Sequence, residues 1–109
     1  MKAQTIFNKL AKRALDHRRA SDPYGACQYR TEGGLACFVG CVIPDRKYTP
    51  AMERKSVLHL KDDGLLPASL VPHADLLASA QGIHDNRDPG QWDDDLRALA
   101  ALHECTYPR

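Results

Sequence analysis

Apolar residues recur at helical spacing in four separate stretches of this chain, and that pattern restricts the possible folds more than any other feature. The first stretch places Ile6, Phe7 and Leu10 on one face and charged residues on the other, which predicts an amphipathic helix over about residues 4–19. Further helices are predicted over 50–60, over 73–83, and from Asp88, a capping residue followed by proline. The residues expected to face the core in these three helices are Met52, Val57, Leu60, Leu76, Leu77, Ala80, Ile83, Trp92, Leu96, Leu99 and His103.

The glycine-containing segment after the first predicted helix is typical of a small β-hairpin. Residues 26–30 and 35–39 are the expected strands, and Gly33 or Gly34 supplies the positive φ that the loop between them needs. The second limb can instead coil into a helical turn over 38–43, since its small residues suit close packing.

Two registers of this hairpin are open. Cys27 lies opposite Cys37 if the loop is three residues long, whereas Cys37 faces Arg30 if the two glycines are the central residues. We therefore expect a mostly helical α+β fold, with about four helices and one small β-hairpin, in a single compact domain spanning residues 1–109.

The charges are balanced overall but unevenly distributed. Fifteen Lys and Arg face 14 Asp and Glu, which argues against a generic binder of polyanions. Residues 1–20 carry six cations and one acid, whereas residues 85–109 carry three cations and six acids. These two regions are either solvated faces that attract each other in the fold or a polar surface for a partner.

No apolar run approaches the roughly 20 residues that a membrane-spanning helix needs, and the first residues lack the apolar core of a secretory signal. We therefore expect no membrane association and a cytoplasmic location.

Four cysteines raise the question of a metal site. If zinc is bound, the expected ligands are Cys27, Cys37 and Cys41, with a fourth ligand from a histidine or from Cys105. The cysteines lack the two-residue spacing of a zinc knuckle, so we predict no metal or other cofactor. Cys37 is expected to be buried as a small hydrophobic residue, and a Cys27–Cys37 disulfide is not expected in a reducing compartment.

Cys37, His84 and Asp85 together have the composition of a thiol nucleophile, a base and an orienting acid. Adjacent side chains on a helix point in different directions, so Asp85 is not expected to orient His84. No motif for stabilising an oxyanion is present either. We predict that the protein is not an enzyme, with Cys37 as the nucleophile if it is one.

Tyrosine and arginine gather around the predicted hairpin and its exit. Because hot spots of protein interfaces favour these residue types, we predict that this surface binds a partner. Its residues are Tyr29, Arg30, Arg46, Lys47 and Tyr48.

Several segments resemble a group of small, largely uncharacterised accessory proteins of tailed phages and prophages. The matching segments are Cys27-Gln28-Tyr29-Arg30, the run from Gly34 to Asp45 that contains Cys37-Phe38-Val39-Gly40-Cys41, Tyr48, Met52-Glu53, and Ile83-His84-Asp85 followed by Trp92. The resemblance spans about residues 5–103. It implies a bacterial cytoplasm and an accessory role in infection, and it supplies no catalytic residues.

The expected function is therefore that of a phage or prophage interaction protein that binds and blocks a host factor, such as a component of antiviral defence. Its partner would be a host or phage protein. Three alternatives are left open: nucleic-acid binding through the basic first helix, a small-ligand or nucleotide sponge formed by oligomers of the Tyr and Arg surface, and a cysteine enzyme that uses Cys37.

Overall fold

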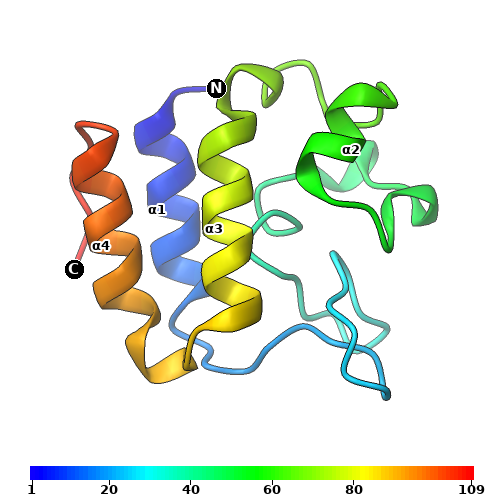
Figure 1. The fold of residues 1–109 in the computed structure, drawn as a ribbon, viewed down its shortest axis with the longest axis horizontal. Helices are drawn as coiled ribbons and strands as arrows, with labels where there is room; N and C mark the ends of the chain where they lie inside the picture. The colour runs from blue at the N-terminus through cyan, green and yellow to red at the C-terminus, as the bar shows by residue number, and fades with distance from the viewer.

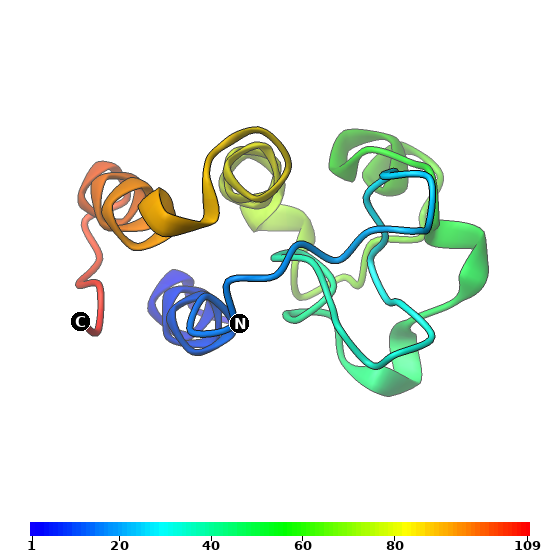
Figure 2. The ribbon, with the colours of Figure 1, turned by 90° about the horizontal axis from the view of Figure 1, so that it is seen from below.

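Three helices lie side by side in the computed structural model, which describes all residues 1–109 (Figure 1). They are α1 (Ala3–Arg13), α3 (Ala74–Asn86) and α4 (Trp92–Leu102). α1 and α3 run in the same direction and α4 runs antiparallel to both, as the colours of Figure 1 show. α4 packs against α1 and against α3, and the end-on view shows the three helices as a small bundle (Figure 2).

Most of the remaining chain forms a second group of segments beside α3 (Figure 1). α2 (Val57–Asp62) packs against α3, and the Ser56 hydroxyl caps its first turn by accepting the N–H of His59 at 3.1 Å. The chain also contains four short 3₁₀ helices: η1 (Asp45–Lys47), η2 (Pro50–Met52), η3 (Val71–His73) and η4 (Pro89–Gln91), the last of which connects α3 to α4. None of the helices has the length and apolar character that a membrane span requires.

The prediction of a β-hairpin is wrong, and the fold is all-α rather than α+β. Only isolated bridges form there, one of them between Arg30 and Ala36, which matches neither predicted register. Thr31 closes the loop early, because its N–H binds the Leu35 carbonyl at 2.8 Å while its hydroxyl accepts the Leu35 N–H. Residues 38–43 then form consecutive turns, so the helical-turn alternative describes the second limb better than a strand does.

Two predicted helices are shorter than expected. The first ends at Arg13 and not at 19, because the Arg13 guanidinium turns onto the backbone carbonyls of Asp16 and Arg18, both at 2.7 Å. The helix expected over 50–60 is interrupted between η2 and α2, where Arg54 adopts a positive φ of 66°.

The predicted core is largely confirmed. The exceptions are Ile83, which is only partly buried, and His103, which is exposed because α4 ends at the preceding residue. Cys37 is fully buried, as expected. At the centre, Trp92 meets Phe38 edge to face at 4.8 Å between ring centroids and stacks on the His84 ring at 5.4 Å.

Side chains replace strand pairing in the irregular segment. The Glu53 carboxylate accepts the backbone N–H groups of Tyr29 at 2.9 Å and Arg30 at 3.2 Å, and it also accepts the Tyr48 hydroxyl at 2.6 Å. Gly40 sits directly against the Tyr29 carbonyl, so the two limbs approach as closely as backbone permits.

The two ends of the chain are joined by a reciprocal pair of hydrogen bonds. The Gln4 amide donates to the Thr106 carbonyl at 2.7 Å and accepts the Thr106 N–H at 2.9 Å. No ion pair connects the basic residues 1–20 to the acidic residues 85–109. The acidic region pairs within itself, for example Arg87 with Asp95 at 2.9 Å.

Gly40→Ala is expected to lower the free energy of unfolding by about 3 kcal/mol, because the added Cβ would lie 1.9 Å from the Tyr29 carbonyl oxygen and the backbone would have to move. Gly33→Ala is the matched control, since its nearest atom would be the Thr31 hydroxyl at 3.9 Å, and its cost should stay within about 0.5 kcal/mol. Urea unfolding measures both. Equal stability of the two variants would contradict the close approach.

Candidate functional site

His84 is a buried histidine on α3 with both ring nitrogens engaged. The backbone N–H of Ala20 donates to Nε2 at 3.1 Å, so Nε2 carries a lone pair and the proton of the neutral ring is on Nδ1. Nδ1 lies 2.8 Å from Oδ1 of Asp85 and 3.8 Å from the Cys27 sulfur. His84 therefore donates to the Asp85 carboxylate and is an acceptor only toward the backbone.

The expectation that Asp85 cannot orient His84 is wrong. Nδ1 is the ring nitrogen nearest its own backbone, so the next side chain along the helix can turn back and reach it. Gln81, one helical turn earlier, donates from Nε2 to the same Oδ1 at 2.9 Å and to the Cys27 sulfur at 2.9 Å. Cys27, Gln81, His84 and Asp85 form one hydrogen-bonded group, which we call the Cys27 cluster.

The protonation states in the Cys27 cluster follow from these contacts. The neighbouring Cys37 thiol and burial both raise the pKa of Cys27, so it is a neutral thiol. Burial opposes charge on Asp85, but hydrogen bonds from His84, Cys27 and Gln81 outweigh it and lower the pKa of that carboxyl.

His84 experiences opposing influences. Burial acts to lower the pKa of His84, but the hydrogen bonds to Asp85 and Cys27 outweigh burial. The net effect is a pKa above the usual value of histidine. The Ala20 N–H acts against protonation, because a proton on Nε2 would place two donors against each other. The neutral ring, with its proton on Nδ1, is the form that satisfies every partner.

This arrangement does not supply an activated nucleophile. Cys37 is buried, its sulfur accepts the Gly40 N–H at 3.3 Å, and the thiol beside His84 belongs to Cys27 instead. A base for Cys27 would need a free lone pair facing the sulfur, but Nδ1 carries the proton. The geometry therefore suits binding better than nucleophilic chemistry.

The three cysteines predicted as zinc ligands do not assemble into one set. The Cys41 thiol donates to the Phe38 carbonyl at 3.0 Å, and burial raises the pKa of Cys41 to about 12. Neither Cys37 nor Cys41 belongs to the group of donors on Cys27, His84 and Asp85, which lie within 4.8 Å of one another. All four cysteines are free thiols.

The donor types of the Cys27 cluster could hold a metal, but the surroundings of His84 do not fit one. A metal on Nδ1 would require the proton on Nε2, where a metal-bound histidine normally donates to a carbonyl or carboxylate. Here Nε2 faces the Ala20 N–H, which is itself a donor.

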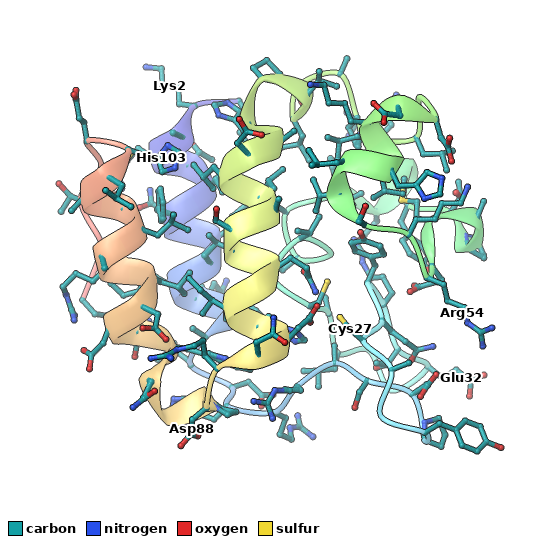
Figure 3. All side chains as sticks on the ribbon, viewed as in Figure 1. Lys2, Cys27, Glu32, Arg54, Asp88 and His103 are labelled. Carbon is teal, nitrogen blue, oxygen red and sulfur yellow. The ribbon has the colours of Figure 1, made fainter.

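A surface pocket of about 430 Å³ opens beside the Cys27 cluster, between α3 and the segment that leads into α2. Its polar lining includes Cys27, Gln81 and Asp85, and its apolar lining includes Val57 and Ala78. Figure 3 shows Cys27 directed from its loop toward α3. A smaller pocket of about 190 Å³ is lined by Cys27, His84, Asp85 and residues from the segment 19–25.

The sequence reasoning missed Gln81 and chose the wrong cysteine. Gln81, His84 and Asp85 follow the i, i+3, i+4 spacing that places side chains together on a helix, so a polar group on α3 could have been found. The contact with Cys27 could not, because it depends on the path of a segment without regular structure.

The residues predicted to bind a partner have different structural roles. Tyr29 is buried, at 5% exposure, and its hydroxyl donates to the Lys55 carbonyl at 2.6 Å. Arg30 lies over the Tyr48 ring at 5.2 Å, and both side chains are half-buried. Arg46 and Lys47, on η1, are exposed.

Comparisons of the chain with protein-family models, curated proteins and solved structures find no match.

We expect the protein to keep its melting temperature when a chelator is added, because the Ala20 N–H opposes a metal on His84 and Cys27, Cys37 and Cys41 do not form one set of ligands. Thermal melts with and without chelator test this, with elemental analysis of the purified protein alongside. Stoichiometric zinc together with a loss of about ten degrees on chelation would show that a structural metal is present.

Proposed function

We propose that the protein is a phage- or prophage-encoded interaction protein that binds a host factor and blocks it, with antiviral defence components as the first candidates. The observation that carries this proposal is a preorganised pair of side chains, Arg30 and Tyr48, beside two free cations, Arg46 and Lys47.

The Arg30–Tyr48 pair is held in place from within the chain. Arg30 donates to the Asp45 carboxylate at 2.6 Å and to the Ile43 carbonyl at 2.7 Å, and the Tyr48 hydroxyl is fixed by Glu53. The Arg30 side chain is still 26% exposed. Side chains that are already fixed lose less conformational entropy on binding, and Arg and Tyr are the residue types most often found at interface hot spots.

Arg46 and Lys47 determine which partner chemistry suits this surface. Their side chains are exposed and make no hydrogen bond or ion pair within the chain. Charges of this kind steer association and favour an oppositely charged face. The proposed partner therefore presents acidic side chains to η1.

Arg30 itself is a poor probe of binding. Its removal would free the Ile43 and Gly40 carbonyls as well as Asp45, so a binding loss could reflect local unfolding. The free cations on η1 provide the cleaner test.

The double variant Arg46→Glu with Lys47→Glu is expected to weaken partner binding about tenfold or more at low salt, because two attractive charges become repulsive. The partner is first captured with tagged protein from infected host lysate, identified, and purified for titration. The melting temperature should change little, because both side chains are exposed and neither makes an internal hydrogen bond or ion pair.

The matched control is Lys9→Glu with Lys12→Glu, two exposed cations on α1. These changes should alter only the association rate and its salt dependence. If they abolish binding while the η1 variant binds normally, the surface is on α1, and nucleic-acid or acidic-partner binding there becomes the better proposal.

A further inference from the structure

The pocket beside the Cys27 cluster has the size of a small-molecule site and is separate from the η1 surface. Its volume of about 430 Å³ lies within the range of ligand pockets, roughly 300–1,000 Å³. Val57, Leu58 and Ala78 supply an apolar side, while Cys27, Gln81 and Asp85 supply a polar side. Such a mixture orients a ligand with one apolar part and one polar end.

One carboxylate oxygen of Asp85 accepts no N–H donor in this pocket. The N–H groups of His84 and Gln81 both bind Oδ1 and not Oδ2. The Cys27 thiol, a weak S–H donor, also lies beside this carboxyl and helps to lower its pKa. The side chain is 34% exposed. No Lys or Arg pairs with it, and His84 is neutral while the Ala20 N–H occupies Nε2. Asp85 is therefore a half-buried negative charge without a counter-ion.

The N–H and O–H groups beside Asp85 are used elsewhere, and the Cys27 thiol offers it only a weak S–H donor. Both N–H groups of the Gln81 amide are used, one on the Cys27 sulfur and one on Asp85 Oδ1, and the Tyr29 hydroxyl donates to Lys55. Lys55 is itself paired with Asp63 at 2.8 Å. The unpaired Arg54 lines the pocket but extends away from Cys27 into solvent (Figure 3). A strong donor for this carboxylate therefore has to come from a ligand, and a cationic one suits the charge best.

Gly82 gives an independent indication that the pocket is kept open. It lies within α3, where glycine is among the least favourable residues. A Cβ built on Gly82 would meet no atom within 4 Å, and its φ is not positive, so neither packing nor backbone conformation requires glycine. The absence of a side chain at Gly82 leaves space in the wall of the pocket.

We propose that this pocket binds a small organic cation, an amine or amidine on an apolar stem, with the charged nitrogen on Oδ2 of Asp85 and the stem against Val57, Leu58 and Ala78. This site goes beyond the proposed interaction with a host factor and does not depend on it. The η1 charge variants should leave it unchanged.

The test uses n-butylamine and benzamidine as probes, with n-butanol and butyrate as neutral and anionic counterparts. Titrations of the full chain are followed by NMR through the backbone amide of Gly82 and the side-chain amide of Gln81. The two cations should shift these resonances in a saturable manner at millimolar concentrations, while butanol and butyrate should not. Absence of saturation by either cation, or equal binding of butyrate, would overturn the proposal.

Two variants separate the site from general stability. Asp85→Asn should weaken cation binding about tenfold or more, whereas Asp75→Asn, which alters an exposed acid on the same helix, should bind normally. Gly82→Ala should weaken binding while raising the melting temperature by about 4 °C, since alanine favours the helix. Unchanged binding in Asp85→Asn, or in Gly82→Ala, would contradict the assigned position of the ligand.

The cation could also be the side chain of a protein lysine, so Nα-acetyl-lysine amide is titrated beside n-butylamine. Equal or weaker binding of the capped lysine supports a free small molecule. Clearly tighter binding would overturn that part of the proposal and assign the pocket to a partner's lysine.

Discussion

The hydrogen bond from the Ala20 backbone to His84 is the contact on which both the fold and the pocket depend. It attaches the segment after α1 to α3, and the same imidazole ring stacks on Trp92 at the start of α4. It also fixes the tautomer, so His84 donates to Oδ1 of the Asp85 carboxylate. A single buried ring thus positions three parts of the chain and determines the charge of the neighbouring pocket.

Arginines provide much of the order that strands would otherwise supply. Arg13 binds backbone carbonyls of the segment that follows α1, Arg19 binds the His84 carbonyl at the end of α3, and Arg30 binds those of Gly40 and Ile43. Each guanidinium satisfies carbonyls that no regular structure pairs. Several cations that look available to a polyanion in the sequence are therefore used internally, which leaves the exposed lysines of α1 as the main basic groups there.

The helices and their core could be predicted from the sequence, because periodic apolar spacing depends only on local geometry. The correct parts include the buried faces of α3 and α4 and the burial of Cys37. The hairpin could not be distinguished from irregular structure. Its glycines and alternating residues fit a strand pair, whereas the outcome depended on Thr31 closing the loop early and on Glu53, more than 20 residues away, taking the backbone N–H groups.

The candidate site shows the same limit. The sequence identifies His84 and Asp85 as residues that could carry chemistry. The prediction that Asp85 does not orient His84 is wrong, and the thiol beside His84 belongs to Cys27 and not to Cys37. Spacing along α3 contains enough information to group Gln81, His84 and Asp85. The approach of Cys27, the Ala20 N–H that sets the tautomer, and the opening beside Gly82 exist only once the tertiary structure is formed.

The pairing of Gln4 with Thr106 has a consequence for the order of folding during synthesis. α1 leaves the ribosome first, yet α4, against which it packs, is made some 80 residues later. Until then the apolar face of α1 has only part of its final cover. Such long-range closure slows folding and extends the time for which nascent apolar surface is exposed. The arginine and glutamate contacts of the irregular middle segment close within residues 29–53, so those contacts do not depend on the synthesis of α4.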